Sequence, residues 1–344
     1  MKLGILTGGG DAPGLNAAIR AVALCAFADR SQVVGIRNGW AGLTGDTDVW
    51  ALRPEDVTGI LSRGGTILGT SRINPLADTG VMEAVAANIS RLGIDALAVM
   101  GGDDTLSVAA ALAERGGPVV GVPKTVDNDL QQTEYCIGFD SAVAIVTEAV
   151  DRLHITAASH HRVMVVEAMG REAGWVTLMG GLAGGADLII IPEFAADLGG
   201  VVEHLHSRRG RGKSYSIIAI SEGARVAGLP EPSIENESLD AFGHLRLSRR
   251  GIGERLGGQL EAHTGFETRV TVLGHTQRGG TPTAYDRIWA TRVGAAAYEL
   301  AKAGEFGKIP VKHGDTTAVS RIAEVVAGLR LVPEHLYRLA QILY

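Results

Sequence analysis

Short apolar runs of strand length recur along this chain and alternate with segments of helical pattern. The runs are continuous, which is typical of strands in a parallel sheet that helices cover on both faces. The pattern predicts an α/β fold, in which ligand sites lie beyond the carboxyl ends of the strands. The predicted strands are Leu3–Leu6, Val33–Ile36, Ala96–Met100, Val119–Val122, Val163–Val166, Leu188–Ile191, Ile217–Ile220 and Val270–Leu273.

The composition is that of a globular chain large enough for more than one hydrophobic core. Of its 344 residues, 46% are hydrophobic and 20% are charged, which favours two domains over one. The formal net charge of −6 argues against a large nucleic-acid footprint, although a few local arginines suffice to bind small anions. We therefore expect no nucleic-acid partner.

The chain lacks the sequence signals for secretion and for membrane insertion. It opens directly into a strand pattern at Lys2, without the charged, apolar and cleavage regions of a signal peptide. Apolar runs such as Leu188–Ile191 are far shorter than the roughly 20 residues that cross a bilayer. Cys25 and Cys136 lie in apolar surroundings without metal-ligand spacing, which indicates free buried thiols. We expect a cytoplasmic protein with no membrane partner.

A glycine-rich turn, Thr7–Gly14, leads from the first strand into an alanine-rich helical segment, Asn16–Phe27. Glycines let the backbone approach an anion closely, and free N–H groups at a helix start favour phosphate. The turn fits neither the Walker A nor the dinucleotide fingerprint, since Pro13 stands where the latter needs glycine. It is either a phosphate-binding turn or only a tight turn.

Two further segments stand out by composition alone. Val226–Arg250 contains two prolines, several acids and then three arginines, which predicts an exposed excursion to which we assign no role. The basic stretch Arg208–Lys213 is interpreted as a solvated loop, with binding of a phosphate-bearing ligand or effector as the alternative.

An acidic segment, Gly101–Thr105, follows the strand Ala96–Met100 and opens a helical pattern. Helix capping accounts for one of its acids, because Asp and Thr accept hydrogen bonds from the first free backbone N–H groups. Two acids and two glycines exceed what a cap requires. We expect Asp103 to take part in metal or phosphate chemistry, with Mg²⁺ as the preferred ion because it favours carboxylate and phosphate oxygens.

A second acidic segment, Pro123–Asp129, follows the strand Val119–Val122. Asp127 or Asp129 is placed to accept a hydroxyl proton during phosphoryl transfer, and Lys124 and Thr125 are placed to hold the donor's oxygens. The alternative is an Asx-turn beside a surface lysine. Four carboxylates and one lysine converge at these two strand ends, which favours a phosphoryl-transfer site.

Further polar segments follow other strands. Met169–Arg171 and Glu222–Arg225 each follow a predicted strand, so that Arg171 can stabilise negative charge and Glu222 can bind a sugar hydroxyl. Arg269 and the run His275–Gly280 surround the last clear strand and supply donors suited to a sugar phosphate. A lone histidine is usually structural, but His275 has an arginine three residues away.

Together these motifs resemble the phosphofructokinase family, and the resemblance covers nearly the whole chain. It implies transfer of a phosphoryl group to the 1-hydroxyl of fructose 6-phosphate, giving fructose 1,6-bisphosphate. The motifs stand in the family's order: Thr7–Arg20, Gly101–Thr105, Pro123–Asp129, Ser159–Arg162, Met169–Arg171, Glu222 and Gly274–Gly280.

The resemblance also implies a role for individual residues. Asp127 would be the base, Asp103 would place Mg²⁺ and Arg171 would stabilise the moving charge. Arg162 and Arg269 resemble residues that a neighbouring subunit contributes, which implies a homo-oligomer, either a dimer or a tetramer. Gly10 and Lys124 would hold the donor, and the sugar phosphate would be held by Thr125, Asp127, Met169, Gly170, Arg171, Glu222, His275 and Arg278.

The phosphoryl donor depends on two positions at which ATP-using members typically carry glycine. This chain has Asp104 and Lys124 there, as in the family's pyrophosphate-dependent branch. A carboxylate at position 104 would repel the α-phosphate of ATP, and Lys124 would neutralise the shorter donor. Because pyrophosphate is the less exergonic donor, the resemblance implies a reversible reaction in glycolysis or gluconeogenesis.

Other functions are weighed against this hypothesis. The first alternative is an ATP-dependent phosphofructokinase, and the second is a sugar-phosphate sensor without turnover. Sedoheptulose 7-phosphate is a possible additional acceptor. NAD and lipid kinases share a Gly-Gly-Asp turn, but Pro123–Asp129 and His275–Gly280 go beyond that shared feature. Leu24 and His154 stand where arginines that bind effector phosphates would be expected, which makes allosteric control doubtful, although Arg211 and Lys213 leave a remnant anion site open.

The resemblance implies two doubly wound α/β domains with mainly parallel sheets and the active site in the cleft between them. The larger domain is expected to comprise residues 1–138 and 252–304 and to bind the donor and Mg²⁺. The smaller is expected to comprise residues 139–251 and 305–344 and to bind the sugar phosphate.

Overall fold

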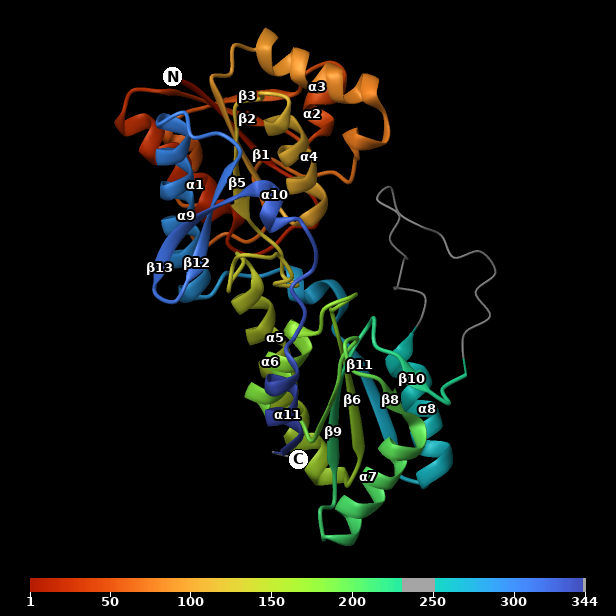
Figure 1. The fold of residues 1–344 in the computed structure, drawn as a ribbon. Helices are drawn as coiled ribbons and strands as arrows, with labels where there is room; N and C mark the ends of the chain where they lie inside the picture. Colours follow the sequence, from red (N-terminus) through yellow and green to blue (C-terminus); the bar gives the residue numbers. More distant parts are fainter. Residues whose placement is uncertain (231–250, 343–344) are drawn as a thin grey trace. The chain divides into compact units, whose positions relative to one another are not determined.

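The computed structural model describes residues 1–230 and 251–342, which form two compact units (Figure 1). Unit 1 comprises residues 1–141 and 278–329 of the described chain. Unit 2 comprises residues 142–230, 251–277 and 330–342. Each unit has its own sheet and its own hydrophobic core.

Unit 1 is built on a five-stranded sheet of order β3-β2-β1-β4-β5. The strands β2, β1, β4 and β5 run parallel, and only β3, at one edge, pairs antiparallel, with β2. The strands are β1 (Lys2–Thr7), β2 (Gln32–Ile36), β3 (Val49–Leu52), β4 (Ala96–Gly101) and β5 (Val119–Pro123).

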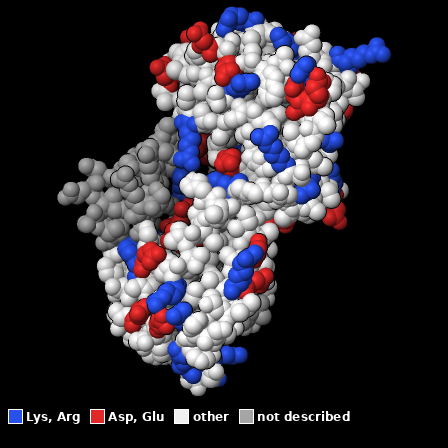
Figure 2. Space-filling model, turned by 180° about the vertical axis from the view of Figure 1, so that it is seen from behind, with Lys and Arg blue, Asp and Glu red and all other residues white. Residues whose placement is uncertain are grey.

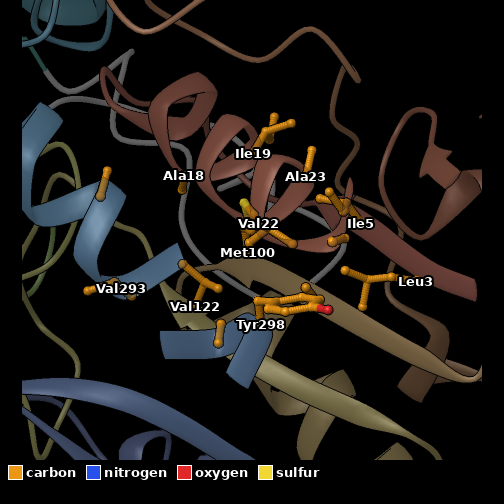
Figure 3. Packing of buried hydrophobic residues seen from close by; sticks show 14 of the residues in the cluster. Leu3, Ile5, Ala18, Ile19, Val22, Ala23, Met100, Val122, Val293 and Tyr298 are labelled. Atoms are coloured by element: carbon orange, nitrogen blue, oxygen red, sulfur yellow. The ribbon is translucent and has the colours of Figure 1, made fainter. Parts of the chain in front are cut away.

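Helices cover both faces of this sheet, as its continuous apolar strands require. On one face, Leu3, Met100 and Val122 of the sheet pack against helices α1 (Leu15–Ala28) and α9 (Ala284–Lys302) (Figure 3). These helices approach closely at Gly294, where a side chain would lie 2.8 Å from the Ala18 carbonyl oxygen. The other face carries α2 (Ala41–Thr44), α3 (Thr79–Arg91), α4 (Asp103–Glu114), the hairpin β12 (Lys308–His313) and β13 (Thr316–Arg321), and α10 (Ile322–Val325).

Unit 2 is built on a four-stranded parallel sheet of order β11-β6-β9-β7. The strands are β6 (Val163–Ala168), β7 (Leu188–Ile190), β9 (Ser216–Ser221) and β11 (Thr268–Val272). Helices α7 (Leu198–Gly210) and α8 (Ile252–Thr264) cover one face. The short pair β8 (Ala196–Asp197) and β10 (Val226–Ala227) packs on this same side. The opposite side carries α5 (Phe139–His160), α6 (Trp175–Gly184) and α11 (Glu334–Ile342).

Glycines set the packing of α6 against α5. A side chain at Gly180 would lie 2.5 Å from Val146, and one at Gly184 would lie 2.6 Å from Val150. Both pairs are four residues apart, one turn of each helix, so the two helices are in close contact along this line.

All eight predicted strands are confirmed, and so are the helices predicted after the glycine turn and after the first acidic segment. The strands β3, β8, β10, β12 and β13 were not predicted. β8 and β10 have only two residues each, and β13 is largely polar and partly exposed. β3 was overlooked although its four residues are all apolar. Most of the predicted excursion Val226–Arg250 lies outside the described residues.

The predicted domain boundaries differ from those of the structure. Residues 252–277 belong to unit 2, because α8 packs on β6 and β11. Residues 305–329 belong to unit 1, because β12 packs beside β5. The chain passes between the units after Ser141, Gln277 and Leu329.

Burial corrects the prediction for Arg208 and confirms the prediction of free thiols, except that Cys25 is only half-buried. Arg208 does not lie in a solvated loop: it is 8% exposed at the end of α7, and its guanidinium contacts Asp187 at 2.5 Å and Ser216 at 3.1 Å. Cys136 is buried and Cys25 is half-buried, and both are free thiols.

The charged side chains of the visible surface are intermixed. Figure 2 shows Lys and Arg beside Asp and Glu on that face, with broad uncharged areas between them. None of the helices in the described chain combines the length and the apolar character needed to cross a bilayer.

Candidate active site

The glycine turn between β1 and α1 is held in place by backbone hydrogen bonds. The Gly8 amide donates to Met100 O at 3.0 Å, and the Gly9 amide donates to Ser71 O at 3.3 Å. A side chain at Gly8 would lie 2.7 Å from Thr105 of α4, so this close approach requires glycine. The turn therefore lies directly beside the start of α4, which carries the first acidic segment.

Lys124, immediately after β5, is buried against this turn. Its Nζ donates to Gly8 O at 3.1 Å and to Gly10 O at 2.5 Å, and the residue is 2% exposed. Burial, followed by the nearby Arg278 guanidinium, lowers the pKa of Lys124 to about 8, against the opposing effect of Asp11 and Asp127. The alternative of a surface lysine is therefore wrong.

Arg278 lies on the same turn. Its Nη1 donates to Asp11 O at 3.1 Å, and a side chain at Gly10 would lie 2.5 Å from that atom. Its buried Nε has no hydrogen-bond partner within the described protein. Lys124 and Arg278 thus place two cations against Gly10. Their hydrogen bonds given above are to neutral carbonyl oxygens. This arrangement suits an anionic ligand.

Carboxylates gather next to these cations. Asp103 and Asp104 form the first turn of α4, and neither is its N-cap, which is Gly102. Burial, and then the charges of Asp127 and Asp103, raise the pKa of Asp129 to about 7. The three acids Asp103, Asp127 and Asp129 are therefore close enough for their charges to oppose one another.

The second acidic segment is held by its own side chains. Asn128, which has a positive φ of 53°, accepts a hydrogen bond from the Cys136 amide at 2.9 Å and donates to Glu134 O at 3.2 Å. The Asp127 amide donates to the Thr125 hydroxyl at 3.1 Å. Asn128 was not among the candidate residues, since its role depends on Cys136, eight residues later.

These acids fit a hard divalent cation. Within residues 1–230 and 251–342, no three His, Cys, Asp or Glu side chains form a metal-binding group. Mg²⁺ is commonly held by one or two carboxylates together with substrate phosphates, so a complete set of protein ligands is not required. A cation would also relieve the repulsion from Asp127 and Asp103, which adds to the effect of burial on the pKa of Asp129.

In unit 2, the carboxyl ends of β6 and β9 bring two predicted segments together. The Gly223 amide donates to Gly170 O at 3.0 Å, and the Glu222 amide donates to Ala168 O at 2.9 Å. A side chain at Gly223 would lie 1.8 Å from Arg171 O, so only glycine permits this approach. Arg171 and Glu222, both half-buried, therefore start from adjoining turns.

The same end of unit 2 holds Met169 and His275. The Met169 amide donates to the buried Gln277 Oε1 at 3.2 Å, and Met169 O accepts from the Thr177 hydroxyl at 3.3 Å. His275 is exposed in the short 3₁₀ helix Gly274–Arg278. Sequence reasoning did not single out Gln277, which connects this helix to Met169.

Arg162 and Arg269 lie at the opposite end of the same sheet. Arg162 precedes β6, and Arg269 is the second residue of β11. Both contact one oxygen of Glu267, at 2.7 Å and 2.5 Å, and the hydrogen bond from Arg162 is the main reason that the pKa of Glu267 is lowered. Glu267 gave no signal in the sequence.

Three comparisons place the chain among known proteins. Residues 2–301 match the family described as Phosphofructokinase. The "Pyrophosphate--fructose 6-phosphate 1-phosphotransferase" of Streptomyces coelicolor is 50% identical over 98% of both chains. The "ATP-dependent 6-phosphofructokinase 3" of the same organism is 43% identical over 99% of both.

A solved structure agrees with these matches. Pichia pastoris phosphofructokinase in the T-state superposes with a TM-score of 0.82 at 31% identity, over 99% of this chain and 36% of that one. The mainly parallel sheets agree with the similarity along nearly the whole chain, and this chain belongs to the phosphofructokinase family.

Proposed function

We propose that this protein is a pyrophosphate-dependent 6-phosphofructokinase. It transfers a phosphoryl group from pyrophosphate to the 1-hydroxyl of fructose 6-phosphate and releases phosphate, reversibly, in glycolysis or gluconeogenesis. Its free cysteines support the accompanying proposal of a cytoplasmic location.

The observation that carries the proposal is the position of Lys124. The buried ammonium group of Lys124 lies between the Gly8 and Gly10 carbonyls and next to Arg278. The Gly8–Gly10 turn, which we propose binds the donor, therefore has two positive charges beside it. Pyrophosphate concentrates its negative charge on two phosphates and matches this pair. Asp104, in the first turn of α4, adds a charge that would repel a longer polyphosphate chain.

We assign donor binding to Gly10 and Lys124, and Mg²⁺ binding to Asp103. Bound Mg²⁺ would neutralise charge on the donor's oxygens. Asp127 accepts the proton of the sugar's 1-hydroxyl as the phosphoryl group is transferred, and Arg171 stabilises the negative charge in transit. Asp104 and Lys124 set the choice of donor.

We assign the sugar phosphate to the remaining candidates. Arg171 and Glu222 leave adjoining turns at the carboxyl end of the unit 2 sheet, and Met169, Gly170 and His275 lie at that same end. The complete proposed set comprises Thr125, Asp127, Met169, Gly170, Arg171, Glu222, His275 and Arg278.

Arg162 and Arg269 require a second chain. β6 has six residues, so its length separates Arg162 from Arg171 by about 20 Å. One sugar phosphate cannot contact both arginines of the same unit. This supports the proposal that a homo-oligomer, a dimer or tetramer, completes each site with Arg162 and Arg269 of a neighbouring subunit.

The test compares pyrophosphate with ATP at matched concentrations, with Mg²⁺ and fructose 6-phosphate, and measures fructose 1,6-bisphosphate. Wild-type protein should turn over with pyrophosphate alone. The double variant Asp104→Gly/Lys124→Gly should lose most pyrophosphate activity and gain activity with ATP. Lys302→Gly, which removes an exposed ion pair with Asp29, serves as the matched control.

Wild-type turnover with ATP alone would contradict the donor assignment and favour the ATP-dependent alternative. Similarity to the ATP-dependent 6-phosphofructokinase 3 of Streptomyces coelicolor keeps that alternative open. Turnover with neither donor would favour a sugar-phosphate sensor.

A further inference from the structure

Asn16, on the first turns of α1, is completely buried, although asparagine is a polar residue. Its side chain makes three hydrogen bonds to one distant loop. Nδ2 donates to Arg63 O at 3.0 Å and to Gly64 O at 3.1 Å, and Oδ1 accepts from the Ile67 amide at 2.8 Å. Every strong hydrogen-bonding position of this amide except one acceptor site is thereby used.

The loop that Asn16 holds, residues 63–71, continues to the glycine turn. The Thr70 hydroxyl donates to Gly9 O at 2.6 Å, and Ser71 O accepts from the Gly9 amide at 3.3 Å. The loop thus binds both the carbonyl oxygen and the amide of Gly9.

A second set of contacts anchors the middle of the loop. The Thr7 hydroxyl at the end of β1 contacts the Thr66 hydroxyl at 2.9 Å and donates to Gly69 O at 2.8 Å. The loop is therefore connected to the sheet directly before the glycine turn, and through Asn16 to the helix directly after it.

The same loop is also packed against the segment that follows Arg278. A side chain at Gly64 would lie 2.1 Å from Gly280 O, so the two backbones are in direct contact. A displacement of residues 63–67 would consequently disturb the turn at Gly9 and the backbone beside Arg278, the two sides of the proposed donor site.

We propose that Asn16 is a positioning residue for the phosphoryl donor: by binding Arg63, Gly64 and Ile67 it holds the loop 63–71 against the Gly8–Gly10 turn. Asn16 does not touch the donor. This inference rests on the proposed function only in that the Gly8–Gly10 turn binds the donor.

The test uses Asn16→Asp, which keeps the shape and the acceptor for Ile67 but replaces both donors with an oxygen facing carbonyl oxygens. The KM for pyrophosphate should rise about tenfold or more, whereas the KM for fructose 6-phosphate should change less than about twofold. Asn88→Asp is the matched control, because Asn88 also donates to two backbone carbonyls, Leu43 O at 2.8 Å and Gly45 O at 3.2 Å, at the end of α2.

Thr70→Val tests the other end of the same connection and keeps the side-chain shape. It should also raise the KM for pyrophosphate selectively, and the double variant with Asn16→Asp should be less than additive, because both act through Gly9. If Asn16→Asp does not fold, Thr70→Val alone decides the inference.

A folded Asn16→Asp variant with lowered melting temperature but unchanged KM for the donor would overturn the inference, and so would an unchanged KM in Thr70→Val. Wild-type turnover with pyrophosphate reports separately on the proposed function. If the wild type uses ATP instead, the same comparison of KM values for ATP tests Asn16. A wild type inactive with both donors would overturn both proposals.

Discussion

The ammonium group of Lys124 lies 2.5 Å from the carbonyl oxygen of Gly10, the residue proposed to approach the donor. Gly8 O, its second hydrogen-bond acceptor, is neutral as well. Hydrogen bonds to neutral groups lessen the cost of burying a charge but supply no opposite charge. The lowered pKa of Lys124 reflects this cost, which an anionic donor would offset.

The pKa of Lys124 gives the first prediction. Since it is about 8 in the free protein, the ammonium form is lost as the pH rises above 8. Because kcat/KM reports on the free enzyme, its value for pyrophosphate should fall about tenfold per pH unit above that point. The measurement is a series of initial rates from about pH 7 to about pH 9.5.

Lys124→Met provides the control for this profile. Its residual kcat/KM should be low and should not show the decline above pH 8. The same decline in both proteins would mean that another group causes it.

Asp127→Asn tests the proposed base. Without a proton acceptor, kcat should fall by about 10²- to 10⁴-fold, while the KM for fructose 6-phosphate changes much less. Asp95→Asn is the control, since this exposed residue precedes the amino end of β4, whereas Asp103 follows its carboxyl end. Unchanged kcat in Asp127→Asn would remove the assignment.

The raised pKa of Asp129 predicts that the stability of the protein depends on pH. Its pKa is raised from 3.8 to about 7, so the folded protein binds more protons than the unfolded chain between these values. The stabilisation is fully present below pH 3.8 and is lost as the pH rises through 7. Denaturant titrations without Mg²⁺ should therefore show a steeper loss of stability with rising pH in wild type than in Asp129→Asn.

Asp286, whose pKa is raised to about 6 by burial, also makes stability fall as the pH rises. Because it does so in both wild type and Asp129→Asn, only the difference between their profiles reports on Asp129. Added Mg²⁺ should restore stability at pH 8 more in wild type than in Asp129→Asn. Identical profiles with and without Mg²⁺ would argue against a cation beside Asp129.

Mixing two inactive variants tests the shared site. Arg162→Ser and Asp127→Ser should each have little activity, and subunit exchange between them should restore part of it, because some sites then contain both native residues. A mixture of Asp103→Ser and Asp127→Ser should not recover, since both residues belong to unit 1 of one chain. Absence of recovery in the first mixture, with exchange demonstrated, would contradict a contribution from a partner subunit.

Much of the fold was predictable because buried parallel strands contain almost no polar positions. β4 and β5 are buried at every residue, and their sequence therefore reads as a continuous apolar run. The hairpin strand β13 is largely polar and partly exposed, so its pattern is weaker, whereas the edge strand β3 is apolar but only four residues long. The domain boundaries were wrong because they depend on which sheet α8 and β12 pack against.

The candidate site was predictable at the ends of strands. Lys124 and Asp103 follow buried strands of the unit 1 sheet, and Arg171 and Glu222 follow buried strands of the unit 2 sheet. The topology of a parallel sheet places such residues at its carboxyl edge. The sequence by itself therefore determined the fold class, the acidic and basic residues at that edge and the family.

Only the tertiary structure decided which of these groups meet. Arg278 contacts Asp11 across 267 positions, Asn16 binds a loop about fifty positions away, and Glu267 joins Arg162 to Arg269. Apart from the pair Glu267 and Arg269, these contacts join residues far apart in the chain and have no local pattern, because a hydrogen bond depends on distance and direction in space. The pKa values of Lys124 and Asp129 were equally beyond the sequence, since burial is the main cause of both shifts.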